Sequence, residues 1–128
     1  MSSAVIITVS LKDSSSDPPK LKLKDSIGDS GDNNLNTDVS LGANITWVPD
    51  LASGIQSIDI VPNNGQTSIF ESGPTGDGTG KFVATIKETE PIDPVTNKKV
   101  KSENYTIKFL IDGDDTEYPH DPKLTIKN

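Results

Sequence analysis

The sequence predicts an all-β domain in which two sheets pack as a sandwich, and three observations favour this class. Turn-forming residues are abundant, with fourteen Asp, nine Asn, ten Gly and nine Pro in 128 residues, a composition that suits short strands joined by tight turns. Apolar and polar residues alternate in several segments, as they do in strands with one buried face. Turn signals recur between those segments every ~8–12 residues, which is typical of sandwiches. We therefore expect a single domain over residues 1–128 with about seven to nine strands.

Alternation defines the expected strands of the first half of the chain, which are 4–11, 21–23, 39–48 and 56–61. Segment 25–37 consists mostly of Gly, Asp, Asn and Ser, so it is expected to be an exposed loop. Segment 39–48 is expected to form a strand pair or one bent strand around Gly42, with Ile45 and Trp47 turned inward. Residues 49–54 are expected to form a connection with room for one helical turn.

The expected strands of the second half are 67–70, 82–89, 105–111 and 124–126. Residues 62–65, Pro-Asn-Asn-Gly, are hairpin-type turn residues. Segment 72–80 holds four glycines and a proline and is expected to be a second loop. Segment 91–102 is the least regular and is expected to be an excursion between two strands that extend beyond the sandwich. Together the segments predict an immunoglobulin-like sandwich with Trp47 at the centre of its core.

Charge excludes two classes of partner. The formal net charge is −7, whereas nucleic acids and anionic membrane surfaces bind cationic faces. All basic residues are lysines, so the residue best suited to bidentate recognition of phosphate is missing. Lysines gather at two places, which are Lys20, Lys22 and Lys24 on one strand face, and Lys98, Lys99 and Lys101 in a loop or hairpin. We interpret both groups as solvated edges that discourage aggregation between strands.

The sequence contains no membrane-spanning or targeting signal that we recognise. Because the sequence has no Cys, it does not indicate whether the protein works in an oxidising or a reducing compartment. The first residues carry no basic region, and their apolar stretch is shorter than that of a signal peptide. No segment approaches the length of a membrane span. We therefore expect a protein that is cytoplasmic as written, or exported without a cleavable signal peptide.

Several short motifs, taken in order, form a framework of turn and core residues. They are Gly42-Ala43-Asn44-Ile45-Thr46-Trp47, Ile69-Phe70 with Ser72-Gly73, Gly80-Lys81-Phe82, and Tyr105-Thr106-Ile107. In order and spacing this framework resembles the cupredoxins, and the similarity extends from about residue 39 to the C-terminus. The resemblance implies a cupredoxin-like β-sandwich.

The copper ligands of such a fold are missing. A blue-copper site needs a thiolate and two imidazoles, but the chain has no Cys, a single His and a single Met at its first position. The resemblance places the first His ligand near Ile55 and the thiolate at Phe109 or its neighbour, while His120 lies beyond the expected ligand position. The resemblance therefore implies the fold without copper or any other cofactor. A second similarity, to small bacterial inclusion-body proteins, rests on the inner Trp47 and the closing Asp-Pro strand over 121–126.

Two groups of acidic and amide residues are candidates for calcium binding, because carboxylate and carbonyl oxygens are the ligands that calcium prefers. The groups are Asp29, Asp32, Asn33 and Asn34, and separately Asp112, Asp114 and Asp115. Neither follows the twelve-residue EF-hand pattern, and β-turns need Asp and Gly in any case. A calcium-dependent binding or adhesion module is the alternative function that these loops support.

Catalytic constellations are not evident in the sequence. His120 beside Asp121 suggests an oriented imidazole, but a lone His in a segment bounded by prolines is typical of a surface or strand-entry residue. No Cys is available as a nucleophile, and no Ser lies in a nucleophile-elbow pattern. Paired carboxylates need a cleft that fixes their separation, which a sandwich of this size rarely builds. We expect a protein that is not an enzyme.

The leading hypothesis is a non-catalytic structural or protein-interaction module, bacterial and homo-oligomeric, whose partner is a protein such as a second copy of itself. Interaction is expected at strand edges. The first strand carries apolar residues on both faces at Val5, Ile6 and Ile7, and Ile6 breaks the alternation expected of an outer strand. Ile6 either lies under the loop 25–37 or packs on a neighbouring subunit by edge pairing or strand donation.

The first prediction concerns copper. Purified protein titrated with copper should show no intense blue charge-transfer absorption, because no thiolate is available to bind the metal. Visible absorption spectroscopy checks this, and a stoichiometric complex with a strong blue band would contradict it.

Overall fold

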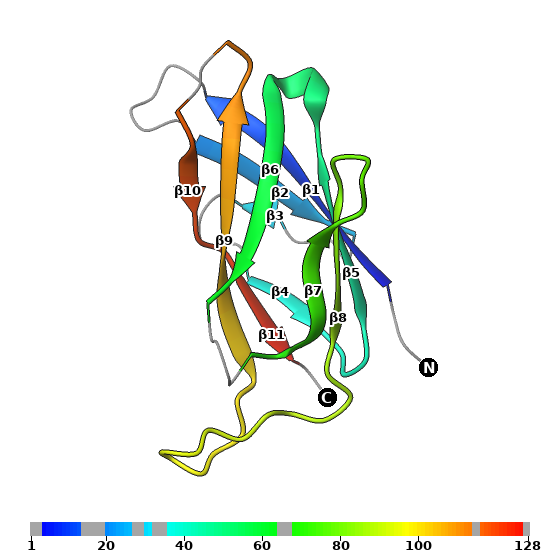
Figure 1. Cartoon of the computed structure of the whole chain (residues 1–128), viewed down its shortest axis with the longest axis vertical. Helices are drawn as coiled ribbons and strands as arrows, with labels where there is room; N and C mark the ends of the chain where they lie inside the picture. Colours follow the sequence, from blue (N-terminus) through cyan, green and yellow to red (C-terminus); the bar gives the residue numbers. More distant parts are fainter. Residues whose placement is uncertain are drawn as a thin grey trace.

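The structure is a computed structural model that describes residues 4–13, 20–26, 30–31, 36–63, 68–113 and 116–126. In these residues the chain forms two mixed sheets that face each other, with β6, β9 and β10 in front of β1 and β2 (Figure 1). The all-β sandwich predicted from the sequence is therefore confirmed.

The first sheet has six strands in the order β3-β2-β1-β5-β8-β7. Their bounds are β1 (Ala4–Asp13), β2 (Lys20–Asp25), β3 (Ser30–Gly31), β5 (Asn44–Pro49), β7 (Phe70–Gly76) and β8 (Phe82–Ile86). The second sheet has five strands in the order β10-β9-β11-β4, with β6 paired to β9. Their bounds are β4 (Asn36–Val39), β6 (Ile55–Pro62), β9 (Ser102–Ile111), β10 (Tyr118–His120) and β11 (Lys123–Ile126).

The described residues contain more strands than the seven to nine expected, and the additional ones are short. The segment 39–48 is neither a strand pair nor one bent strand, because the chain turns at Gly42, whose φ is +76°, and passes from β4 in one sheet to β5 in the other. The segment 25–37 was expected to be a loop, but it contains β3 and the start of β4. The strand β10 was missed because Pro119 lies at its centre; proline is tolerated there because β10 is an edge strand.

The prediction of a loop over 72–80 is also wrong, because β7 continues to Gly76. This strand lies at an edge of its sheet, and its pairing with β8 shifts register twice. Gly73 has a φ of +73°, and a Cβ there would overlap the carbonyl oxygen of Val83, so no other residue fits. An edge strand accommodates such bulges and a proline more easily than a central strand does.

The core lies between the sheets and is built by alternation along the strands. Along β9 the residues at every second position, from Glu103 to Ile111, are buried, and β1 shows the same alternation. At the centre the Trp47 ring meets the Tyr105 ring edge-on, with centroids 5.3 Å apart. Phe70 meets Trp47 in the same manner at 6.3 Å. The prediction that Trp47 is buried between the sheets is confirmed.

Two connections between strands lie at opposite ends of the sandwich. After β5 the chain forms one 3-10 turn, η1 (Leu51–Ser53), as the sequence had room for, and Gly54 ends it with a φ of +109°. Ser53 fixes η1 to the end of β1, because its Oγ accepts a hydrogen bond of 2.8 Å from the Leu11 N–H. At the opposite end the connection from β8 to β9 projects below the sheets as an arm (Figure 1). The excursion predicted for 91–102 is therefore confirmed.

The second prediction is that Trp47→Ala lowers the free energy of unfolding by about 3–5 kcal/mol, as truncation of a large buried aromatic side chain does. The neighbouring Thr46, which faces the outside of the same strand, provides the control: Thr46→Ala should cost less than about 1 kcal/mol. Urea unfolding followed by circular dichroism measures both. Equal costs for the two variants, or free quenching of the native indole by iodide, would contradict the placement of Trp47.

Candidate interaction surface

The three predicted interaction residues divide between the two faces of β1. Val5 and Ile7 are buried in the core, whereas Ile6 points outward and is 48% exposed. The premise that β1 is an outer strand is wrong, because β5 pairs with it on one side and β2 on the other. Backbone groups of β1 are thus occupied by partners within the chain, so this strand offers no free edge for pairing. Of the three residues, only Ile6 is placed to contact another molecule.

Ile6 is one end of a row that crosses the outer face of the six-stranded sheet. It lies directly opposite Thr46 on β5, and Thr46 lies opposite Val83 on β8. The row continues to Thr75 on β7. Val83 is 39% exposed. The row therefore presents β-branched side chains to solvent on β1, β5 and β8, which are paired on both sides, and on the edge strand β7.

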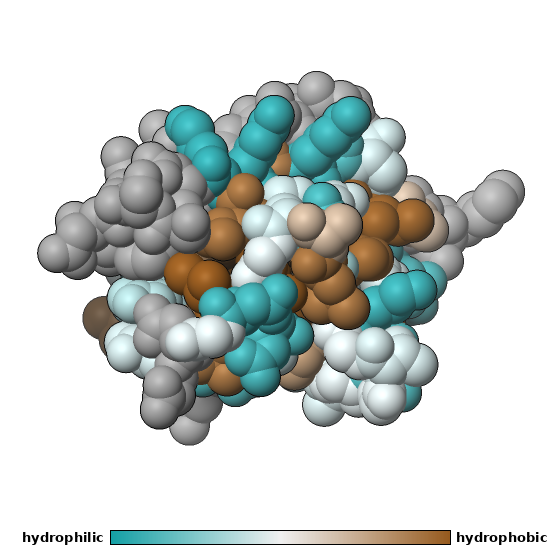
Figure 2. Space-filling model, turned by 90° about the horizontal axis from the view of Figure 1, so that it is seen from above, coloured by the Kyte–Doolittle hydropathy of each residue, from teal (hydrophilic) through white to brown (hydrophobic). Residues whose placement is uncertain are grey.

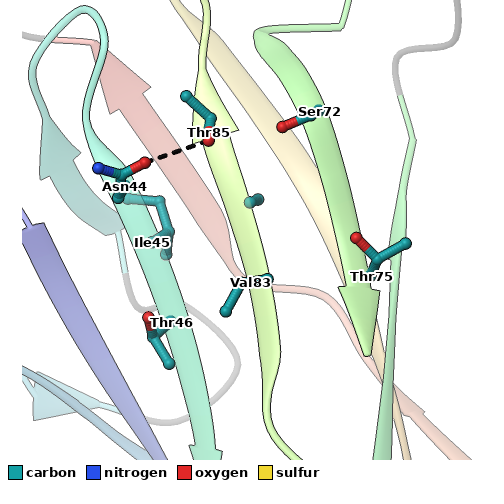
Figure 3. A pocket seen from close by; sticks show the side chains of 8 residues that line it. Asn44, Ile45, Thr46, Ser72, Thr75, Val83 and Thr85 are labelled. Carbon is teal, nitrogen blue, oxygen red and sulfur yellow. Dashed lines mark hydrogen bonds between the residues drawn. The ribbon is translucent and has the colours of Figure 1, made fainter. Parts of the chain in front are cut away.

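A shallow hollow of about 300 Å³ lies along this row. Figure 3 shows its side chains on three adjacent strands, with the Thr85 hydroxyl donating a hydrogen bond of 3.1 Å to the Asn44 amide oxygen. The outward-facing residues around it are Asn44, Thr46, Ser72, Thr75, Val83 and Thr85. The hollow is lined by neutral side chains and is open to solvent. The hollow therefore offers no charged side chain to a ligand.

A second hollow, of about 260 Å³, adjoins Ile6 on the side of β2 and includes Thr8 and Lys24. Ser26 hydrogen-bonds both backbone groups of Ile6. Its Oγ accepts a hydrogen bond from the Ile6 N–H at 3.0 Å, and its N–H donates to the Ile6 carbonyl at 2.8 Å. Much of the loop that was expected to cover Ile6 lies outside the described residues. The side chain of Ile6 nevertheless keeps about half of its surface exposed.

The calcium candidates are only partly placed. Asp112 is exposed just after β9, and its N–H donates a hydrogen bond of 3.0 Å to the Gly54 carbonyl. Asp114 and Asp115, like Asp29, Asp32, Asn33 and Asn34, lie outside the described residues. Within the described ranges, no group of three or more His, Cys, Asp or Glu side chains is arranged to hold a metal ion. The calcium alternative therefore gains no geometric support from the part of the chain that the structure describes.

The positions that the cupredoxin resemblance assigns to copper ligands are used for packing. Ile55 and Phe109 are both buried in the core. His120 is buried in β10, where it pairs with Ile107. The adjacent Asp121 is exposed, and its carboxylate accepts a hydrogen bond of 2.7 Å from the Thr106 hydroxyl. His120 and Asp121 thus differ in exposure, which does not favour the oriented acid–base pair considered from the sequence.

Two buried carboxylates were not predicted, and both have structural partners. Glu103 accepts hydrogen bonds from the Asn63 N–H at 2.8 Å, the Ile69 N–H at 3.0 Å and the Ser68 hydroxyl at 2.8 Å. It therefore holds both ends of the connection between β6 and β7. Asp25 accepts a hydrogen bond of 2.8 Å from the buried Thr37 hydroxyl. The signal was present in the sequence, because each acid continues the inward-facing alternation of its strand.

Tyr105 is a third buried residue with an ionisable side chain. Burial raises the pKa of its phenol well above the ordinary value, and the nearby Asp25 carboxylate adds to this rise, while the Trp47 indole opposes it. An ionised phenolate is poorly solvated between two sheets, so the hydroxyl keeps its proton at neutral pH. Tyr105 therefore contributes its ring to the core and offers no base or nucleophile.

Among the described residues, no helix is long and apolar enough to cross a membrane. No model of a known protein family matches the sequence, and no curated protein matches it.

The third prediction concerns Glu103. Glu103→Ala should lower the free energy of unfolding by about 3 kcal/mol, because buried N–H groups lose a charged acceptor. Glu71→Ala, which removes an exposed carboxylate from β7, should change it by less than about 0.5 kcal/mol. Chemical denaturation of both variants measures the difference, and a Glu103→Ala protein as stable as the wild type would contradict the assigned role.

Proposed function

We propose that this protein is a non-catalytic β-sandwich that acts as a structural or protein-interaction module and associates with copies of itself. The observation that carries the proposal is the exposure of aliphatic side chains on rigid, hydrogen-bonded elements, foremost Ile6 at 48% in the middle of the six-stranded sheet. Exposed apolar groups on ordered strands are available for contact without loss of backbone entropy. Such groups mark protein-interaction surfaces when they form a continuous patch.

The use of the polar residues supports the non-catalytic part of the proposal. Glu103 and Asp25 hold loops and strands together, and Tyr105 is kept protonated in the core. The two hollows on the outer face of the first sheet are shallow and are lined by few charged groups. An active site is instead expected to combine a concave pocket with titratable groups of perturbed pKa that face it.

The resemblance to cupredoxins remains part of the proposal. We infer a cupredoxin-like framework in which the ligand positions have been filled by hydrophobic residues such as Ile55 and Phe109. Under this interpretation, the volume of a metal site has been used to extend the core. The inherited property is the rigidity of the sandwich rather than electron transfer.

The fourth prediction tests the outer face of the first sheet. Ile6→Lys should weaken self-association by about tenfold or more, because it places a hydrated charge in a desolvated contact. Ser57→Lys adds the same charge at an exposed position on β6 of the other sheet and should leave association unchanged. Sedimentation velocity over a range of concentrations measures both variants against the wild type.

A wild-type protein that remains monomeric at every concentration would contradict self-association. Equal association of the wild type and the Ile6→Lys variant would remove this face from the interface. Runs in excess calcium and in chelator complete the test, because association that appears only with calcium would favour the calcium-dependent alternative.

A further inference from the structure

The most exposed large apolar side chains of the described residues lie at the two ends of the sandwich. Val95 is 90% exposed, Leu51 61% and Ile92 56%, all more than Ile6. Ile92 and Val95 belong to the arm that projects below the sheets, and Leu51 lies in η1 at the opposite end (Figure 1). Among the described residues, the large apolar side chains at the two ends are therefore more exposed than those on either sheet face.

The arm is an ordered hairpin. Its strands are joined by the hydrogen bond from Val100 N–H to the Pro91 carbonyl at 2.7 Å and by the bridge between Ile92 and Lys99. At the tip, the Asp93 carboxylate accepts a hydrogen bond of 2.8 Å from the Val95 N–H. Asn97 completes the turn with a φ of +59°. The aliphatic tip, defined as Ile92, Pro94 and Val95, is thus held in one conformation before any contact.

The arm is also basic, although the molecule is acidic. Residues 91–101 contain three lysines and one aspartate, a formal charge of +2 that leaves −9 for the rest of the chain, given −7 overall. Lys98 and Lys99 are exposed next to the tip, and Lys101 lies 3.9 Å from Glu90 at the base of the arm. An acidic surface with an apolar centre is therefore the complement of this arm.

The opposite end of the same molecule has an apolar centre with carboxylates beside it. Figure 2, which looks down on this end, shows apolar side chains at its centre with hydrophilic side chains along part of their border. We define this surface as the Leu51 end, which comprises Leu51 and the partly buried Leu11, with the carboxylates of Asp50 and Asp112 beside them. Among the described residues, Lys12 and Lys20, which lies opposite Asp13 at the start of β2, are cations of the same end. The Leu11 N–H donates a hydrogen bond to the Ser53 hydroxyl of η1, and the Asp112 N–H donates one to the Gly54 carbonyl at the end of η1.

We propose that copies of this protein join end to end, with the aliphatic tip of one copy docked on the Leu51 end of the next. This inference rests on the proposed function and names the partner and the surfaces. Because the two surfaces differ, the contact is heterologous, and two joined copies together retain one unused tip and one unused end. Repetition of the same contact therefore generates an open linear chain of copies. The lysines beside the tip and the acidic charge of the next copy set the direction of docking.

The test uses one variant for each surface. Val95→Asp removes the tip but keeps the Leu51 end, and Leu51→Asp removes that end but keeps the tip. Both residues are exposed, so both variants should fold like the wild type, as checked by circular dichroism and Trp47 fluorescence. Each variant alone should associate at least about tenfold more weakly than the wild type. Ser57→Asp, a control on the flank of the sandwich, should assemble normally.

The decisive sample is the equimolar mixture of Val95→Asp and Leu51→Asp, measured by native mass spectrometry. With Ile6→Lys added to both variants, so that the outer face of the first sheet does not contribute, a heterologous contact predicts a heterodimer and no larger species, because only one intact tip and one intact end remain to meet. Homodimers of the Leu51→Asp variant would indicate contact between two tips and would overturn the proposal. Association of both variants at wild-type strength would overturn it as well, while leaving the proposed self-association intact. A wild type that remains monomeric at every concentration would overturn both.

Discussion

The sandwich depends on one contact between its sheets, the edge-on packing of Trp47 against Tyr105. Only 31% of the sequence is hydrophobic, so few large side chains are available to fill the space between the layers. Trp47 comes from the centre of one sheet and Tyr105 from the long strand β9 of the other. Aromatic pairs in this geometry contribute more than their buried area alone. The positions of both sheets, and of everything attached to them, follow from this contact.

The rigidity of the sandwich is the reason why we propose that its function lies at its surface. The inward-facing residues are committed to packing, and the buried acids Glu103 and Asp25 are committed to holding connections. The remaining outward positions are the sheet faces, the arm and the turn η1. Aliphatic side chains exposed on such ordered elements lose little entropy on binding, so a small contact area can still give a specific interface. The account of function as interaction, rather than catalysis, rests on this division.

Part of the fold was predictable from the alternation of residues within each strand. The pairing between strands that are distant in the sequence was not predictable. The inward faces of β1 and β9 and the burial of Trp47 follow directly from residues two positions apart. The central place of β1 could not be predicted, because its parallel partner β5 follows far along the chain and parallel pairing leaves no local turn signal. Edge strands with proline, such as β10, were hidden because proline normally argues against a strand.

The candidate surfaces were predictable to the same extent. Local pattern singled out Val5, Ile6 and Ile7, and the strand period alone implies that Ile6 faces away from the other two. Which side is buried depends on the second sheet, and the edge position assumed for these residues depended on pairing that the sequence does not specify. The apolar ends could not be predicted from the sequence for a different reason. Val95 and Leu51 are far apart in sequence and lie in irregular segments, so only the folded chain places one at each end.

Small-angle X-ray scattering over a concentration series tests the central claim most directly. In the Ile6→Lys variant, in which association through the sheet face is weakened, association through the ends predicts that the longest dimension of the particle grows with concentration while the cross-section of a single sandwich stays constant. High salt should shorten the particles, because the Debye length falls from about 10 Å at 0.1 M to about 3 Å at 1 M. Scattering that is independent of concentration, or growth in cross-section at constant length, would contradict the account.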